Sequence, residues 1–222
     1  MDKDFALLHE MRESGNVCLH FYQWEGLALT YGHFANPEQL LNLDFARSAG
    51  VSIGRRPTGG GLILHVSDFA FSLLIPASHQ SFSLNTLKNY LFVNQLIAKA
   101  IYSATAGSLA PSLYEGGQAA QGDLRSFCMA DPAPYDLVDE TGKKICGGAQ
   151  RKTRWGFLHQ GSVSLTKPPF ELVKGLVKDE EVVEAMCDRS YYFTPQLLGC
   201  SNLEEMRALM QAKIQQILLS VV

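Results

Sequence analysis

Three consecutive glycines follow two arginines in the segment RRPTGGG, residues 55–61, and an apolar run begins directly after them. Glycine destabilises the interior of a helix or strand, but its backbone reaches conformations and close approaches that other residues cannot. The run therefore predicts a loop before a strand, with backbone N–H groups that can cradle an anion. The competing interpretation is a β-hairpin turn with charged flanks. The segment has neither the ending of a P-loop nor the glycine spacing of a dinucleotide site.

Short apolar runs alternate with helical patterns along the rest of the chain. Strands are expected at 17–24, 27–31, 51–54, 62–66, 68–76, 135–138, 144–146 and 156–165, with the fourth and fifth forming a hairpin. Helices are expected at 3–13, 37–49, 83–102, 170–187 and 202–220. A long connection rich in Gly, Ala, Ser and Gln is expected at 103–127. Together these elements predict one α+β domain over residues 1–222.

Composition limits the class of function. Hydrophobic residues make up 46% of the 222 residues, enough for a sizeable core, and the net charge of −3 argues against a nucleic-acid-binding protein. The five cysteines show no metal-ligand spacing, and their odd number predicts a reducing, cytoplasmic compartment. The charged N-terminal residues lack the apolar core of a signal peptide, and no apolar run has the roughly 18 residues of a membrane span. We therefore expect no metal, nucleic acid or membrane as a partner.

A second glycine-rich segment, GKKICGGAQ at 142–150, places Lys144 beside Gly147 and Gly148. A lysine in a glycine-lined pocket can neutralise a phosphate or polarise a carbonyl group. The same region forms a basic cluster in an acidic protein, made of Lys143, Lys144, Arg151, Lys152 and Arg154. The competing interpretation is a solvated hairpin whose lysines lie in water.

Three further candidates are less specific. Cys128 follows the long connection, and a cysteine on an exposed loop near lysines can act as a nucleophile. The competing interpretation is a buried, inert thiol. His65 lies in an apolar strand, where a histidine is more often buried and hydrogen-bonded than catalytic, and His159 lies either at a site edge or simply in a strand.

These segments, in this order, resemble the lipoate-protein ligase A and octanoyltransferase family, within the wider group of biotin and lipoate attachment enzymes. RRPTGGG with the following strand and His65 resembles the family's arginine–glycine loop, and KICGGAQR, from Lys144, resembles its lysine motif. LHQGS at 158–162 resembles the strand after that motif, and DFALLHEM and LHFYQW match the opening helix and strand loosely. The resemblance covers most of residues 2–165. It implies a biotin/lipoate-ligase-like catalytic domain with a mixed, mostly antiparallel sheet flanked by helices.

The resemblance also implies a site. The glycine loop and Lys144 would surround the carboxyl end of an octanoyl or lipoyl group, with the acyl tail in an apolar slot that strands 62–66 and 70–75 could line. The acceptor would be a lysine of a lipoyl domain, in an E2 subunit or the glycine cleavage H protein, and the basic cluster would suit docking to it. The residues implied in acyl or acyl-adenylate binding are Arg56, Thr58, Gly59, Gly60, Gly61, His65, Gly147, Gly148, Ala149, His159 and Gly161.

Two chemical routes are open. Cys128, 16 residues before Lys144, resembles the cysteine of single-domain octanoyltransferases and would carry the acyl group as a thioester taken from an acyl carrier protein. The alternative is ATP- and Mg²⁺-dependent ligation through acyl-AMP, with Lys144 and Arg56 on the phosphate. Full ligases carry a C-terminal accessory domain, and 57 residues follow position 165 here, so we expect none in this chain.

Three departures from the family pattern leave a third hypothesis open. Met129, Ala133 and Ala35 stand where the family usually has Phe, Ser and Gln. A non-catalytic module that holds lipoate or a lipoyl domain would tolerate such changes. Biotin attachment is disfavoured because RRPTGGG replaces the GRGRxGR-type loop of biotin ligases.

Overall fold

The computed structural model describes residues 2–116, 124 and 126–221. The strands are β1 Cys18–Phe21, β2 Ala28–Tyr31, β3 Ser52–Arg55, β4 Leu62–His65, β5 Asp68–Pro76, β6 Ser112–Leu113, β7 Leu137–Val138, β8 Lys144–Thr153 and β9 Gly156–Ser164. The helices are α1 Asp2–Ser14, α2 Pro37–Leu40, α3 Leu43–Ser48, α4 Thr86–Ala104, α5 Phe170–Leu176, α6 Glu180–Asp188 and α7 Leu203–Leu219, with a 3₁₀ turn η2 at Pro195–Leu198. None of the helices among the described residues combines the length and apolar character of a membrane-crossing segment.

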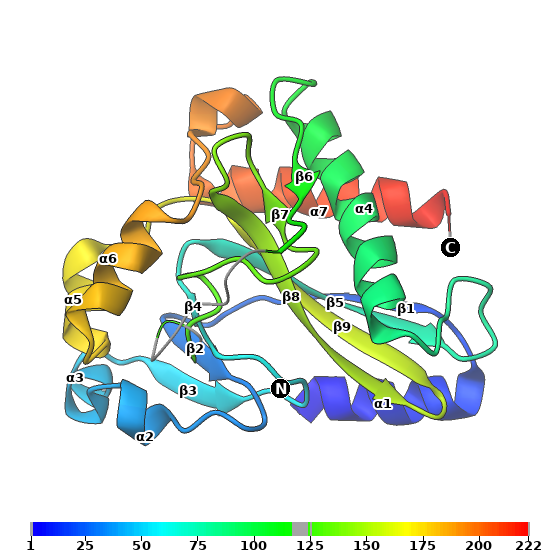
Figure 1. Cartoon of the computed structure of the whole chain (residues 1–222), viewed down its shortest axis with the longest axis horizontal. Coiled ribbons are helices and arrows are strands. Elements are labelled where there is room, and N and C mark those ends of the chain that lie inside the picture. Colours follow the sequence, from blue (N-terminus) through cyan, green and yellow to red (C-terminus); the bar gives the residue numbers. More distant parts are fainter. Residues whose placement is uncertain (1, 117–123, 125, 222) are drawn as a thin grey trace.

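The strands form two sheets, as Figure 1 shows. The larger has the order β1-β5-β9-β8-β7-β6, and all of its neighbours are antiparallel. The smaller has the order β3-β2-β4, with β2 parallel to β3 and antiparallel to β4. The expectation of an α+β domain with a mixed, mostly antiparallel sheet is therefore confirmed.

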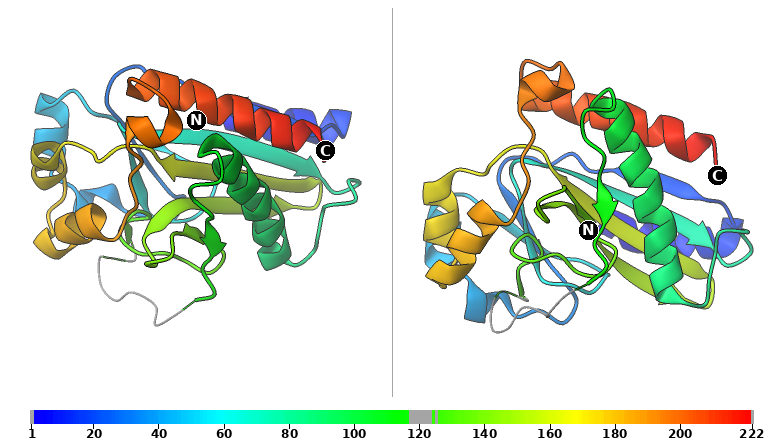
Figure 2. Two further views of the ribbon diagram at one scale, coloured as in Figure 1. Left: turned by 90° about the horizontal axis from the view of Figure 1, so that it is seen from above. Right: turned by 45° about the horizontal axis from the view of Figure 1, so that its top comes forward.

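Helices cover both faces of the larger sheet. Its central strands β5 and β9 are therefore buried along their whole length. Along β5, Phe71 and Leu73 join the core formed with α4 and α7, whereas Leu74 faces the other way and packs with Leu7 and Met11 of α1. This alternation follows the two-residue period of a strand. In the right-hand view of Figure 2, α4 lies in front of the strands and α1 behind them.

The smaller sheet has a core of its own. Leu29 on β2 and Leu62 and Leu64 on β4 pack with buried side chains of α2, α3, α5 and α6. These four helices lie together at the left of Figure 1, away from α4 and α7. Each sheet thus has its own hydrophobic core, one formed with α4 and α7 and the other with α2, α3, α5 and α6.

The expected hairpin at 62–66 and 68–76 is wrong, although both strands are present. β4 pairs with β2 in the smaller sheet, whereas β5 pairs with β1 and β9 in the larger one. The chain crosses between the sheets at Ser67, whose carbonyl oxygen accepts hydrogen bonds from the N–H groups of Leu165 and Thr166, both at 3.0 Å. Pairing to distant strands therefore replaces the local pairing that sequence proximity predicted.

The two expected helices at 37–49 and 170–187 are each divided into two shorter helices. The residues that separate the two halves of one pair contact those that separate the halves of the other. Leu41 and Val177 form an isolated antiparallel bridge between α2–α3 and α5–α6. The N–H of Asn42 donates to Leu176 at 2.8 Å, and the N–H of Lys178 donates to Leu40 at 3.1 Å. Side chains of Asn42 and Asp179 then cap the second helix of each pair.

Other boundaries differ by a few residues. The expected strand at 17–24 is reduced to β1, and α4 begins at Thr86 because the Asn85 side chain caps it. β8 extends to Thr153 and forms a long hairpin with β9. Within the expected long connection, β6 pairs with β7, while residues 117–123 and 125 lie outside the described residues.

Candidate active site

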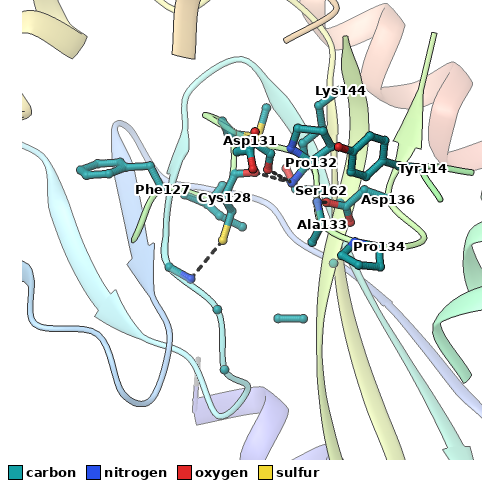
Figure 3. Close-up of a pocket in the computed structure, with 18 of the residues that line it drawn as sticks. Tyr114, Phe127, Cys128, Asp131, Pro132, Ala133, Pro134, Asp136, Lys144 and Ser162 are labelled. Carbon is teal, nitrogen blue, oxygen red and sulfur yellow. Dashed lines mark hydrogen bonds and ion pairs between the residues drawn. The ribbon is translucent and has the colours of Figure 1, made fainter. Parts of the chain in front are cut away.

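A cavity of about 420 Å³ lies where the two sheets diverge. The glycine loop 59–61 forms one wall, the segment 127–136 forms another, and residues 147–150 of β8 form the third. Aromatic side chains, Tyr90 from α4 and Tyr114, complete the lining. Figure 3 shows Cys128 on one side of this space, with Lys144, Asp136 and Tyr114 on the other. The cavity therefore brings together the three segments on which the family resemblance rests.

The glycine loop is held from behind by Arg56, which is only 3% exposed. Its guanidinium donates to the backbone oxygens of Gly59, at 3.2 Å, and Gly61, at 2.9 Å. It also donates to the carbonyl and hydroxyl oxygens of Thr30. Because the loop's carbonyl groups turn toward Arg56, at least one N–H group is left pointing to the cavity side, where the Gly61 N–H donates to Cys128 Sγ at 3.2 Å.

Cys128 is fixed against the start of β4 by its backbone. Its N–H donates to Leu62 at 3.0 Å, and Phe127 forms a parallel bridge with Leu62. A Cβ on Gly61 would lie 2.0 Å from the Ser126 carbonyl oxygen, so only glycine allows the two segments to come this close. The thiol is half-buried and lines the cavity.

The other cysteines occupy different environments. Cys146 is fully buried, and burial raises the pKa of its thiol well above the ordinary value. Burial also raises the pKa of Cys18 and of Cys200. Among the described lining residues, Cys128 is the one cysteine, so it is the candidate nucleophile of the cavity.

Lys144 is buried against the cysteine segment, where three acceptors surround its ammonium group. Nζ lies 2.6 Å from Asp136 Oδ2 and 3.2 Å from the Asp131 carbonyl oxygen. It also donates to the carbonyl oxygen of Cys128 itself. Lys144 is thus bonded to the backbone of the residue that carries the thiol.

The charge of Lys144 is retained although its side chain is buried. Burial lowers the pKa of Lys144, but the carboxylate of Asp136 and the neighbouring sulfur of Cys128 raise it by more, so the net shift is upward. The cation can therefore stabilise negative charge that develops near Cys128.

Asp136 is a site residue that sequence reasoning missed. It lines the cavity, and its Oδ2 accepts from both Lys144 and the N–H of Ala133, at 2.8 Å. The available signal was its place in PAPYDL, residues 132–137, between Cys128 and Lys144 and eight residues before the lysine. One carboxylate on an irregular segment carries no periodicity, so its pairing emerges only in three dimensions.

Several implied acyl contacts lie behind the cavity wall. Thr58 donates to Gln160 Oε1 at 2.6 Å, and His65 lies between Thr30 Oγ1 and Asp68 Oδ2, each at 2.7 Å. Gly161 packs so tightly that a Cβ would lie 2.3 Å from the Phe71 ring. Of the implied residues, Gly59, Gly60, Gly61, Gly147, Gly148 and Ala149 line the cavity, and Arg56, Thr58, His65, His159 and Gly161 do not.

His159 supports the wall beneath Gly148. It is fully buried, and burial lowers its pKa to about 3, so the imidazole is neutral. Its Nδ1 lies 2.9 Å from Gln150 Nε2. A Cβ on Gly148 would lie 2.4 Å from His159 Nε2, so the glycine allows the ring to pack directly under the cavity.

The strand contribution to the cavity differs from the expected slot. Ile63 of β4 lines it, but no described residue of β5 does. β5 pairs with β9, and its Ala70 lines a smaller pocket together with Ile63 and His65, so the expectation that residues 70–75 line an acyl slot stays a prediction. Within the described part of the chain, no three His, Cys, Asp or Glu side chains gather in the manner of a metal site.

Comparisons with known proteins agree with this arrangement. Residues 1–187 match the model of the lipoyl protein ligase A/B catalytic domain. Octanoyltransferase LipM from Lysinibacillus sphaericus (strain C3-41) is 30% identical over 151 residues, covering 66% of this chain and 54% of that protein. The protein of the same name from Geobacillus kaustophilus (strain HTA426) is 31% identical over 191 residues, covering 78% and 67%. The chain thus spans about half to two thirds of the length of these relatives.

A solved structure shares the fold. A bi-partite lipoate protein ligase from Thermoplasma acidophilum superposes with a TM-score of 0.67 at 18% sequence identity, over 91% of this chain and 71% of that one. The family match extends from α1 through α6 and includes the glycine loop, Cys128 and Lys144. The chain belongs to the lipoyl protein ligase A/B catalytic-domain family.

Proposed function

We propose that the chain is a protein lipoylation enzyme that transfers an octanoyl or lipoyl group to the acceptor lysine of a lipoyl domain through a thioester on Cys128. One observation carries the proposal: Cys128 Sγ lines the cavity and accepts a hydrogen bond from the Gly61 N–H, while Lys144 is bonded to the backbone of the same residue. The family match and the relatives named octanoyltransferase LipM support it.

The first step is thioester exchange. The thiolate of Cys128 attacks the carbonyl carbon of an acyl thioester on a carrier protein, and the carrier's thiolate leaves and takes a proton from water. No net oxidation occurs, because one thioester replaces another. Lys144 and the N–H groups of the glycine loop stabilise the negative charge on the tetrahedral intermediate.

The second step forms the amide. The neutral amine of the acceptor lysine attacks the Cys128 thioester, the carbon–sulfur bond breaks, and Cys128 leaves as a thiolate. The attacking nitrogen loses one proton to solvent. Apolar and aromatic lining residues, among them Ile63, Phe127 and Tyr90, hold the acyl tail.

The few cations at the cavity favour this transferase over an ATP-dependent ligase. Among the described lining residues Lys144 is the one cation, and Asp136 already pairs with it. The Arg56 guanidinium is bonded to four backbone and hydroxyl oxygens and does not line the cavity. A triphosphate carries several negative charges, and a single lining cation would offset few of them, whereas it suffices for the one charge of a tetrahedral intermediate.

The proposed partners rest on the family resemblance together with the proposed transfer. The donor is an octanoyl or lipoyl thioester of an acyl carrier protein, and the acceptors are lipoyl domains such as those of E2 subunits and of the glycine cleavage H protein. The five free cysteines suit a reducing cytoplasm.

A transfer assay tests the proposal. The purified chain is mixed with octanoyl carrier-protein thioester and an apo-lipoyl domain, without ATP, and the mass of the domain is followed. We expect an octanoyl amide on the domain, and a loss of rate of about 10³-fold or more in Cys128→Ser. Cys187→Ser, in α6 and outside the lining, is the matched control and keeps the rate. Full activity in Cys128→Ser, or product only when ATP and free lipoate are added, would refute the thioester route.

A further inference from the structure

Exposed side chains beside the cavity form a surface that the transfer chemistry does not use. Four segments contribute: the turn 32–35, the end of β3, the start of α4, and the tip of the β8–β9 hairpin. We call six of their side chains the rim: Phe34, Arg55, Leu84, Lys152, Arg154 and Trp155.

Hydrogen bonds connect these segments to the glycine loop and to one another. The N–H groups of Gly32 and His33 donate to Gly61 and Thr58, at 3.1 and 2.8 Å, so the turn lies directly against the loop. Arg151, next to the lining residue Gln150, donates to Pro57 at 3.3 Å. Lys152 Nζ donates to the Leu84 carbonyl oxygen and joins the hairpin to the start of α4. The turn 32–35, Arg55 and Lys152 thus lie near the cavity, and Arg154 and Trp155 follow Lys152 at the tip of the same hairpin.

The rim combines large apolar side chains with arginine and lysine. Phe34 is 91% exposed and Leu84 is 80% exposed. The guanidinium groups of Arg12 and Arg154 lie over the Trp155 ring, at 5.1 and 4.4 Å from its centroid. Isolated exposed apolar residues are ordinary, but aromatic residues with arginine next to a reactive site are typical of a protein interface.

The segments that form this surface are positively charged, although the whole chain carries a net negative charge. The whole chain has a net charge of −3, yet the segments 32–35, 55–61, 84–88 and 149–155 contain no Asp or Glu. They carry five exposed cations, Arg55, Lys88, Arg151, Lys152 and Arg154. A partner with an acidic surface would complement this region and be steered toward it.

We propose that the rim docks the acceptor domain, through an acidic surface around its target lysine and an apolar contact with Phe34. This inference rests on the proposed function. A lysine has only a four-carbon stem, so its amine reaches the Cys128 thioester only if the domain itself touches the rim of the cavity. A donor whose acyl group travels on a long flexible arm has no such requirement.

Separate half-reactions test this docking. Each variant is first converted to the octanoyl-enzyme with an octanoyl thioester of N-acetylcysteamine, and its mass is measured. The freed octanoyl-enzyme is then mixed with increasing apo-lipoyl domain, and single-turnover transfer is followed. The rim variants are Arg154→Glu and Phe34→Ser. The matched control for charge is Lys99→Glu with Lys174→Glu, on α4 and α5, where both lysines are exposed outside the rim.

We expect the half-saturating concentration of the domain to rise about tenfold or more in the rim variants, with the rate at saturation unchanged and the control within about twofold. Added salt should raise that concentration in the wild type more than in Arg154→Glu. Equal half-saturation in rim variants and wild type would overturn the docking proposal. An enzyme that forms no octanoyl adduct at all would instead refute the proposed function.

Discussion

At the scale of single residues, the site depends on a lysine whose hydrogen-bonding capacity is fully used. An ammonium group has three donors, and Lys144 directs them to Asp136, to the Asp131 carbonyl and to the Cys128 carbonyl. Lys144 therefore supplies fixed positive charge and holds the cysteine segment, and it is not a free base. Asp136 makes this possible because it offsets the cost of burying the charge.

Replacing Asp136 by Asn should therefore destabilise the fold strongly. The variant leaves Lys144 buried beside a neutral amide, and loss of one partner of a buried pair costs about 3–5 kcal/mol. Urea unfolding would measure the change. Asp131→Asn is the control, because its pair with Arg189 is long, at 3.7 Å, and partly exposed, so it should cost less than about 1 kcal/mol. Equal effects of the two variants would contradict this account of Lys144.

Arg56 is a positioning residue, because it touches the glycine loop from the side away from the cavity. In Arg56→Lys one ammonium cannot reproduce the fork that binds Thr30, Gly59 and Gly61 together. The Gly61 N–H should then lose its alignment with Cys128 Sγ, and alkylation of that thiol by iodoacetamide at neutral pH should slow about tenfold. Arg47→Lys, on the exposed surface of α3, should leave the rate unchanged. An unaltered rate in Arg56→Lys would refute the role.

His159 should make the fold sensitive to acid. Its folded pKa of about 3 lies below the ordinary value of about 6.5, so the unfolded chain takes up the proton first. The associated stability is present above about pH 6.5 and is lost as pH falls, by up to about 1.4 kcal/mol per pH unit. Urea unfolding from pH 7.5 to 5 should show a shallower loss in His159→Asn than in wild type, and His9→Asn, an exposed histidine, should behave as wild type. Parallel curves for wild type and His159→Asn would contradict the buried neutral state.

At the scale of elements, sequence patterns predicted the helices and strands that depend mainly on residues close together in the chain. The periodicity of α1, α4 and α7 and the apolar runs of β4, β5 and β9 were sufficient to place them. The breaks at Leu41 and Val177 could not be predicted, because each is stabilised by pairing with the other, more than a hundred residues away. The split of β4 and β5 between sheets has the same cause, since the partners of each strand are distant in sequence.

The contact between the glycine loop and the cysteine segment gives a prediction at this scale. In Gly61→Ala the new Cβ would lie 2.0 Å from the Ser126 carbonyl oxygen, so one backbone segment must move. We expect a loss of about 1–3 kcal/mol in unfolding free energy and slower alkylation of Cys128. Gly59→Ala is the matched control, because its Cβ would meet nothing within 4 Å, and it should change stability by less than about 0.5 kcal/mol. Equal tolerance of both alanines would contradict the close approach.

At the scale of the whole molecule, two cores flank a cavity to which both sheets contribute. The family resemblance of the glycine, cysteine and lysine segments predicted that these parts would meet there. Their geometry was not predictable, because Arg56 and His159 act from behind the wall and Asp136 acts through Lys144. These supporting roles depend on the side of the cavity wall toward which a side chain points. In an irregular segment no periodicity of the sequence indicates that direction.

The most direct test of the central claim is the intact mass of the chain after exposure to octanoyl carrier-protein thioester, without ATP. The account predicts one octanoyl adduct that hydroxylamine removes, that maps to Cys128 and that disappears when an apo-lipoyl domain is added. Absence of the adduct, followed by formation of acyl-AMP once lipoate and ATP are supplied, would contradict it and identify a ligase.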